Sequence, residues 1–370
     1  MPAYPPGPNQ TLTTSSANRD VRLAASRATA GPTSGLGAGS SAAVEAFHPK
    51  TQLRSRVMTE YAISQGPDAS PLLASEPPVW WKASGTVWHH TTADGLLGIL
   101  QSHRLWASSP LSMNDTSELR YGDQVLRAAW ANLDTSEWTS HQLRFSNETM
   151  ETDLLALAEA SCFLVCATSR KDSLNQWQHY SGAQGYALEI KCAPRLAPVG
   201  KQTSAASSPE KIGLFHGWYH VLYEEQHQVA VANSFLGTMK TFADGPPGLP
   251  AEGWKRLSQG MLATMIAQCK HPAFADEHEV RYIVSSAYAE AAEKFRVGAR
   301  GIVPYVELAE DVSSEAVLVT QDPRPLLPIH SLMCGPAAEV EPVLRAARRL
   351  LRVHGYDDVD VQRSVVPYRF

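Results

Sequence analysis

Residues 162–180 read CFLVCATSRKDSLNQWQHY, in which an uninterrupted apolar run gives way to polar and aromatic side chains. The apolar run, 162–169, has the length of a short buried strand. Asp172 or Ser173 then provides a helix N-cap, because short polar side chains accept hydrogen bonds from the first free backbone N–H groups of a helix. Large side chains follow at helical spacing, with a glycine near the end: Leu174, Trp177, Tyr180 and Gly182. The stretch therefore predicts a strand followed by a short helix.

Further strand-like and helix-like segments lie on both sides of this unit. Apolar or alternating runs predict strands over 88–91, 104–110, 185–191, 218–224, 279–284, 302–308 and 360–370. Apolar side chains at helical spacing predict helices over 96–103, 257–269 and 343–351, and 117–160 reads as helical. The helices are unequal in length, and no glycine-rich phosphate loop follows the first strand. We therefore predict an α+β fold with a mixed sheet and flanking helices, rather than a doubly wound one.

The composition indicates a folded protein. The chain has 370 residues, of which 44% are hydrophobic, enough for a substantial core. Its 32 Lys and Arg against 37 Asp and Glu give a formal net charge of −5, so a general polyanion binder is not expected and a protein partner is favoured over nucleic acid. No apolar run approaches the roughly 20 residues that span a bilayer, so we expect a soluble protein without a membrane partner.

The five cysteines are scattered along the chain, as expected for free thiols in a reducing compartment. Cys162 and Cys166 are four residues apart, but no second pair of cysteines or histidines follows at the spacing of a zinc site. We therefore expect neither a disulfide framework nor a bound metal.

The first 56 residues differ from the rest. They are rich in Ser, Thr, Ala, Gly and Pro, poor in acidic residues, and lack the apolar core of a Sec signal. Such a segment cannot bury enough apolar surface to fold alone. We expect a disordered leader over 1–56, which resembles bacterial type III secretion signals and organellar transit peptides but is as readily a plain tail. An irregular linker over 57–85 and a folded domain over 86–370 follow.

Three segments carry reactive side chains at or beside predicted strands: His89-His90-Thr91, the helix that ends near Tyr180, and Glu277-His278-Glu279-Val280-Arg281. On a strand, Glu277 and Glu279 point to one face, because side chains alternate. Two carboxylates on one face repel each other, so the pair indicates either a chemical role or neutralisation by Arg281 on the same face. A core histidine and an aromatic helix face are the ordinary alternatives for His89 and Tyr180.

The segment WHHTTADGLLGILQSHRLWASSP, residues 88–110, resembles the first strand and helix of the poly(ADP-ribose) polymerase branch of ADP-ribosyltransferases. CFLVCATSRKDSLNQWQHY resembles the strand and short helix that follow in that family, and EVRYIV resembles its strand that begins with the catalytic glutamate. The order His89, Tyr180, Glu279 is also the family's order. This resemblance implies an ADP-ribosyltransferase-like split sheet, NAD as co-substrate, and convergence of these three side chains on one cleft.

Residues 86–370 also resemble a large, poorly characterised bacterial family. Its marks are present throughout the predicted domain: His89-His90-Thr91, Met113-Asn114-Asp115, Cys162-Phe163, Asp172 to Trp177 and Tyr180, Glu277-x-Glu279-x-Arg281, Val303-Pro304-Tyr305, Gly335-Pro336, and Ser364 to Arg369. This second resemblance covers more of the chain but implies no activity by itself.

The first resemblance implies a role for each matched residue. His89 would hydrogen-bond an adenosine ribose hydroxyl, the backbone of His90 would hold the nicotinamide carboxamide, and Thr91 would contact the nicotinamide side. Tyr180 would stack on the nicotinamide ring. Glu279 would bind the nicotinamide ribose and steady the developing cation, and Glu277 would orient or deprotonate the acceptor. Asn114 and Arg281 are lesser candidates for substrate contact. His90 replaces the family's glycine, which changes the expected shape of the pocket.

The leading prediction is therefore NAD-dependent transfer of ADP-ribose to a macromolecule by a toxin, an effector delivered to host cells, or a defence protein acting in the bacterial cytoplasm. The same site with water as nucleophile would be an NAD glycohydrolase. A non-catalytic module that recognises ADP-ribose or a protein is the third possibility. The run from Asp115 to Glu118 reads as an ordinary helix cap with an acidic first turn.

Overall fold

The computed structural model describes residues 82–112, 117–181, 185–200, 215–245, 250–285, 292–298, 301–311, 325–336 and 340–367. All of them belong to one compact unit. The strands are β1 (Thr86–Thr91), β2 (Leu105–Ser108), β3 (Cys162–Thr168), β4 (Tyr186–Lys191), β5 (Leu196–Pro198), β6 (Phe215–His220), β7 (Glu279–Ser285), β8 (Glu293–Gly298), β9 (Gly301–Glu310), β10 (Ile329–Cys334) and β11 (Asp360–Arg363). The helices are α2 (Ala93–Ser102), α3 (Glu118–Ala131), α4 (Ser140–Met150), α5 (Leu154–Ser161), α6 (Leu174–Gln176), α7 (Glu225–Ala243), α8 (Ala251–Gln268) and α10 (Val340–Val353), with short helical turns at Pro110–Ser112, Trp177–Ser181 and Pro272–Glu277.

Strand β3 is the branch point of the sheet. One edge of β3 pairs with β7 along its whole length, and β7 pairs with β6. On the other edge, β1 pairs with β3 only at Trp88–Thr168, and β2 only at Ser108–Leu164. From these two points the sheet continues as β1-β4-β10-β11 and as β2-β9, with β5 and β8 on β9. Every pairing between two of these strands is antiparallel except β10 with β11. The predicted mixed α and β structure, with a sheet that is mostly antiparallel, is confirmed.

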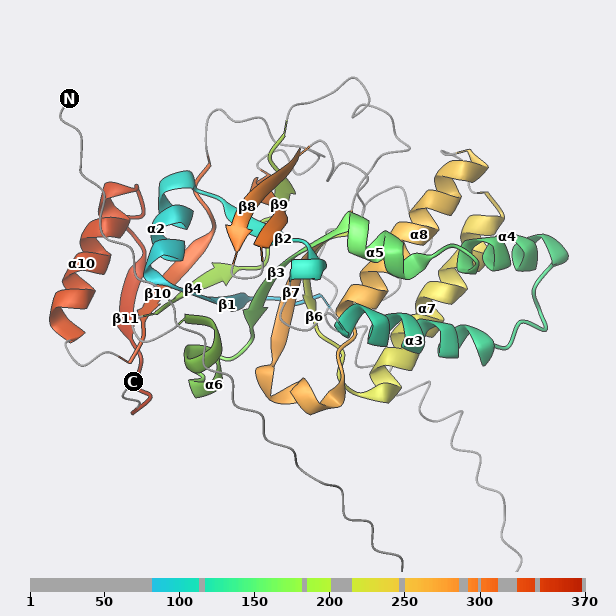
Figure 1. The fold of residues 1–370 in the computed structure, drawn as a ribbon, viewed down its shortest axis with the longest axis horizontal. Helices are drawn as coiled ribbons and strands as arrows, with labels where there is room; N and C mark the ends of the chain where they lie inside the picture. The colour runs from blue at the N-terminus through green and yellow to red at the C-terminus, as the bar shows by residue number, and fades with distance from the viewer. Residues whose placement is uncertain are drawn as a thin grey trace, which may run out of the picture. The chain divides into compact units, whose positions relative to one another are not determined.

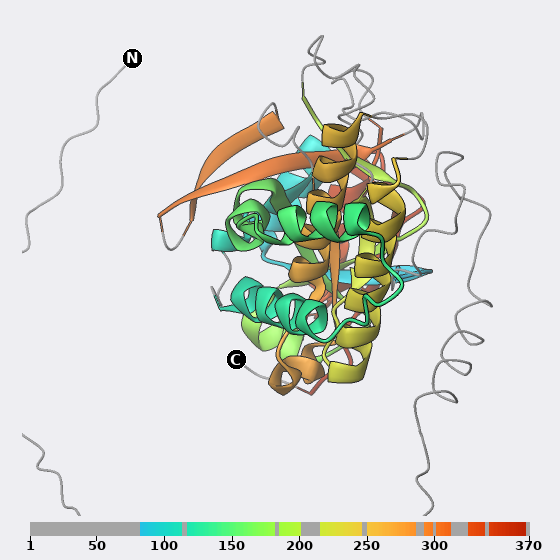
Figure 2. The ribbon, with the colours of Figure 1, turned by 90° about the vertical axis from the view of Figure 1, so that its right-hand side faces the viewer.

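Helices cover the sheet in two separate groups (Figure 1). Helices α2 and α10 pack on one core together with alternate residues of β3, such as Phe163 and Val165. Helices α3, α4, α5, α7 and α8 form the second core, which takes the other face of β3 through Cys162 and Leu164. Figure 2 views the molecule from the end of this second group, where the five helices stack in front of the strands. Strand alternation puts Glu279 and Arg281 on this same face, because Ile283 of β7 belongs to the second core.

The sequence located many of these elements. The predictions over 88–91, 96–103, 162–169, 185–191, 279–284, 302–308 and 343–351 are confirmed, with ends that differ by a few residues. The helical character predicted for 117–160 is confirmed, as three helices, α3, α4 and α5. The predicted terminal strand is limited to Asp360–Arg363. Residues 82–85, predicted as linker, include sheet contacts, because Lys82 bridges Tyr219 and the Ala83 N–H donates to the Trp218 carbonyl. The predicted leader lies outside the described residues.

Helices α3 and α8 touch at Gly122. A Cβ atom at this position would lie 2.2 Å from the carbonyl oxygen of Ile266, and the helix backbone cannot yield without displacing its neighbours. We expect Gly122→Ala to destabilise the protein by about 1–3 kcal/mol, because overpacking forces a shift between the two helices. Urea denaturation measures the change. Gly98→Ala is the matched control, since that helical glycine has no atom within 4 Å of the added Cβ. Equal stability of the two variants would contradict the prediction.

Candidate functional site

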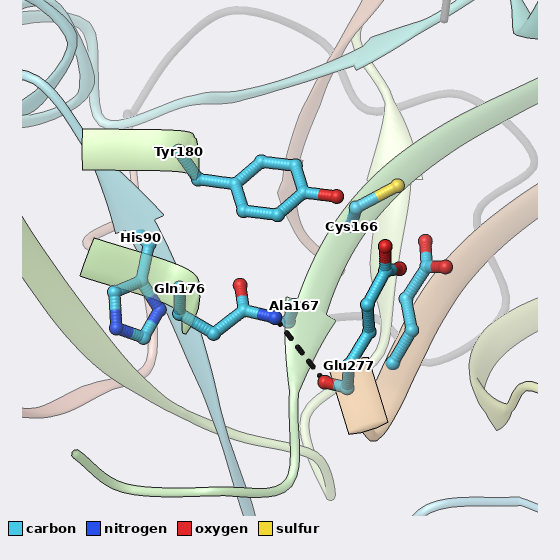
Figure 3. A pocket seen from close by; sticks show the side chains of 7 residues that line it. His90, Cys166, Ala167, Gln176, Tyr180 and Glu277 are labelled. Carbon is cyan, nitrogen blue, oxygen red and sulfur yellow. Dashed lines mark hydrogen bonds between the residues drawn. The ribbon is translucent and has the colours of Figure 1, made fainter. Parts of the chain in front are cut away.

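A pocket lies beside strands β3 and β7, at the edge of the helix group α3, α4, α5, α7 and α8. It is lined by His90, Cys166, Ala167, Gln176, Tyr180, Glu277 and Glu279. In Figure 3 the Tyr180 ring extends toward Cys166, with Glu277 beyond it, while His90 lies on the opposite side. The empty volume is about 280 Å³, including the part open to solvent.

Glu279, the first residue of β7, is held by two cations. The Arg281 Nε donates to its Oε1 at 2.8 Å, and the Arg281 Nη2 donates to its Oε2 at 2.8 Å. The Lys270 ammonium donates to Oε2 at 3.0 Å. Burial raises the pKa of Glu279, but the charges and hydrogen bonds of Arg281 and the charge of Lys270 outweigh it and lower that pKa to about 2. Glu279 is therefore an ionised, fixed carboxylate.

Glu277 also lies in the pocket beside Glu279, but its backbone does not form the predicted strand. It ends the 3₁₀ helix Pro272–Glu277, and His278 then adopts a left-handed conformation with φ of 46° before β7 begins. The prediction that Glu277 lies on the strand is wrong, although its side chain does lie beside that of Glu279. Its carboxylate accepts a hydrogen bond of 2.5 Å from Lys270 rather than from Arg281. The carbonyl of Glu277 accepts from Thr168 Oγ1 and Gln176 Nε2, which ties this turn to β3 and α6.

Glu118 completes a buried charge network. It is the first residue of α3, where it hydrogen-bonds the Arg281 Nη2 and pairs with Lys270 at 3.0 Å. The predicted acidic first turn is confirmed for Glu118, but the residue is not an ordinary exposed acid, since it is 8% exposed and has two cationic partners. Ser117, the N-cap, makes no side-chain capping bond. Three carboxylates, Glu118, Glu277 and Glu279, against Lys270 and Arg281 leave one net negative charge in the network.

Tyr180 belongs to the turn Trp177–Ser181 that follows α6. It is 39% exposed, so one side of its ring is accessible to a ligand. Burial of the rest, with the nearby charges of Glu277 and Glu279, raises the pKa of Tyr180. The phenol is therefore neutral, and the ring offers a flat apolar face beside two carboxylates.

Asp172 fixes the segment that carries Tyr180. One oxygen accepts from Trp177 Nε1 at 2.6 Å and from Ser364 Oγ at 2.7 Å, and the other accepts from the Val365 N–H at 2.8 Å. Trp177 is fully buried against Trp88, Ala187 and Met333. Asp172 therefore joins α6 to the segment after β11, and the N-cap position of α6 is taken by Ser173, the other predicted candidate, without a side-chain capping bond.

The two histidines of β1 lie on opposite faces. His89 directs its Nδ1 to the Cys166 carbonyl at 2.8 Å and does not line the pocket. His90 lines the pocket, where its ring meets the edge of Trp177 with 4.6 Å between centroids. Burial and the neighbouring His89 lower the pKa of His90 to about 4, so this imidazole is neutral. The structure thus brings Tyr180 and Glu279 together with His90, and the expected convergence of His89 on the same pocket is not found.

The remaining predicted residues lie elsewhere. Thr91 ends β1 opposite Tyr186 and does not line the pocket. Asn114 lies outside the described residues. Arg281 is 1% exposed and has Glu118, Glu279 and the Ala267 carbonyl as partners, which leaves it no surface for the predicted substrate contact. Sequence reasoning missed Glu118 because its partner Arg281 is 163 positions away, and it missed Lys270 because no strand or helix periodicity links it to Glu277 and Glu279, seven and nine positions along the chain.

Other chemistries find less support among the described residues. No group of three or more His, Cys, Asp or Glu side chains in them is arranged to hold a metal. Burial and the charge of Glu279 raise the pKa of the Cys166 thiol well above its usual value. Cys166 is therefore protonated and a poor nucleophile. None of the described helices combines the length and the apolar character required to cross a membrane.

Comparison with known proteins adds one similarity. Residues 176–282 match a family model described as a protein of unknown function (DUF2971). The matched segment begins in α6 and ends in β7, so it holds Tyr180, Lys270, Glu277, Glu279 and Arg281. No curated protein and no solved structure matches the chain.

Proposed function

We propose that this protein cleaves the bond between nicotinamide and ribose in NAD and transfers the ADP-ribose to a macromolecule, with a protein favoured as acceptor. The observation that carries the proposal is the meeting of the Tyr180 ring with the Glu277 and Glu279 carboxylates in one pocket. Such a reaction needs a site that binds a planar ring and a sugar and that stabilises a developing positive charge.

The chemistry follows from the charge that develops on the sugar. The bond from ribose C1′ to the pyridinium nitrogen breaks, and its electron pair goes to nicotinamide, which leaves as a neutral ring. The ribose then carries an oxocarbenium-like charge, which carboxylates stabilise in glycoside hydrolysis for the same reason. Glu279 is ionised and fixed before the reaction, so it need not reorganise as the cation forms. A lone pair of the acceptor forms the new bond to C1′, and the acceptor proton passes to Glu277 and then to solvent.

The charge balance of the network supports this assignment. Arg281 and Lys270 are both buried and would disfavour a nearby cation if they outnumbered the carboxylates. The three glutamates leave one net negative charge instead, and the side chain of Glu277 is the most exposed of the three, at 16%. The proposal gives His89 no contact with the reacting sugar, because its ring faces away from the pocket.

The test is nicotinamide release from NAD by the full-length protein, measured with and without a cell extract and with NAD labelled in its adenosine half. Release together with label on a macromolecule is the expected result. Release without labelling would show an NAD glycohydrolase instead. No release under either condition would contradict cleavage and favour a binding module.

Tyr180→Ala should raise the KM for NAD by about two- to tenfold, corresponding to the roughly 0.5–1.5 kcal/mol of a stacked aromatic pair. Tyr180→Phe keeps the ring and is expected to behave like the wild type, since the ring face and not the hydroxyl makes the predicted contact. Steady-state nicotinamide release at varied NAD concentration measures both variants. A phenylalanine variant as impaired as the alanine variant would assign the role to the hydroxyl and contradict stacking.

A further inference from the structure

Lys270 joins all three carboxylates of the network. Its ammonium lies 2.5 Å from Glu277, 3.0 Å from Glu279 and 3.0 Å from Glu118. It is 4% exposed, and its nitrogen also lies over the Phe274 ring, 5.0 Å from the centroid. The ammonium is therefore saturated with protein partners and has little surface left for a ligand.

The backbone of Lys270 is equally constrained. Its N–H donates to the Leu222 carbonyl at 3.1 Å, and its carbonyl accepts from the buried Gln228 Nε2 at 3.0 Å. These bonds fix the residue just after α8 to Leu222, between β6 and α7, and to Gln228 in α7. The Lys270 ammonium therefore has a fixed position, and the glutamate carboxylates are oriented by their contacts with it.

The two pocket glutamates depend on Lys270 to different degrees. Glu279 has two further hydrogen bonds from Arg281, so it keeps its position without Lys270. In the described part of the chain, the Glu277 carboxylate has Lys270 as its hydrogen-bond donor and no bond from Arg281. Removal of Lys270 would therefore release Glu277 and leave Glu279 in place.

We propose that Lys270 is a positioning residue for the acceptor step, which holds the Glu277 carboxylate beside Glu279 where it can take the acceptor proton. The inference rests on the proposed function and deepens it, because it separates cleavage of NAD from transfer. Lys270 keeps its own proton throughout, and the proton of the acceptor moves to Glu277 alone. Its surrounding carboxylates raise the pKa of Lys270 above the usual value despite burial, which agrees with a permanent cation.

The experiment measures nicotinamide release and macromolecular labelling in the same reaction for Lys270→Met, Lys270→Arg and Glu277→Gln. We expect Lys270→Met to lower labelling by about 100-fold, the cost of a misplacement of about 1 Å, while nicotinamide release falls by less than about tenfold. Glu277→Gln should show the same split, and Lys270→Arg should restore part of the labelling because it keeps a cation. Lys255→Met is the matched control, since Lys255 pairs with Glu148 at 3.7 Å near the surface, and it should change neither rate.

A double variant keeps the test valid if the single Lys270→Met variant does not fold. Lys270→Met leaves three carboxylates facing one arginine, whereas Lys270→Met with Glu118→Gln removes one charge of each sign and keeps the net charge of the network. Circular dichroism and Tm identify which of the two is folded, and the ratio of labelling to release is read from that one. An unchanged ratio in a folded, active variant would overturn the role of Lys270 but leave the proposed function standing. A wild-type protein that releases no nicotinamide would overturn both.

Discussion

Arg281→Met should lower the free energy of unfolding by about 3–5 kcal/mol, as expected when one partner of a buried ion pair is removed. Arg281 is 1% exposed, and it donates to Glu279, Glu118 and the Ala267 carbonyl. Without it, three carboxylates, of which Glu118 and Glu279 are buried, would share Lys270 as their cation. A stability of roughly 5–15 kcal/mol is usual for a protein, so this single change would remove a large part of it.

Chemical denaturation in urea measures this loss, with the slope of the transition checked for two-state behaviour. Arg256→Met is the matched control. Arg256 pairs with Glu252 four residues away on the surface of α8, at 3.4 Å, and both side chains are more than half exposed. Its removal should cost less than about 1 kcal/mol. An Arg281 variant as stable as the Arg256 variant would show that the buried network contributes nothing to the fold.

Glu279→Gln should lower the rate of nicotinamide release by about 100- to 1,000-fold or more, the usual effect of removing a preorganised electrostatic group. The amide keeps the shape and can still accept a hydrogen bond from Arg281. It removes the charge that would stabilise the ribose cation. The network would then hold two carboxylates and two cations, so we expect the protein to remain folded and to lose less stability than the Arg281 variant.

Single-turnover release of nicotinamide isolates this step, and Tm establishes that the variant is folded. Glu307→Gln is a suitable control, because Glu307 is also ion-paired on a strand, with Lys294 at 2.8 Å, but it lies in β9 away from the pocket. A folded Glu279 variant that keeps its rate within about tenfold of the wild type would refute the role of Glu279.

The sequence predicted the parts of the site that depend on local pattern. Tyr180 follows an apolar strand within one short helix, and Glu279 begins another apolar strand, so both positions were visible as strand or helix ends. The two histidines show what a local sequence pattern does not predict, namely which face of a strand lies toward the pocket. Alternation predicts that His89 and His90 face opposite sides, but only the register of β1 against β3 decides that His90 shares the face of Glu279.

The partners of the glutamates could not be read in this way. Glu118 looks like any acid in a first helical turn, and Lys270 looks like a surface cation after a helix. Their burial results from the packing of α3 and α8 on β7, which joins residues more than a hundred positions apart. Helix α7 was missed as well, because its polar and small side chains between Glu225 and Ala243 weaken the apolar pattern that its buried face would otherwise show.

The attachment of β1 to β3 through one residue pair places the pocket where two branches of the sheet part. Tyr180 is anchored to the β1-β4-β10 branch, because neighbouring Trp177 is packed among Trp88, Ala187 and Met333 of those strands. Glu279 is anchored to β7, which is bonded to β3 along its length. The distance between ring and carboxylate is therefore set by the packing that joins the branches, namely the hydrophobic core shared by β1, β3, β4 and β7 and the bond from Gln176 to the Glu277 carbonyl.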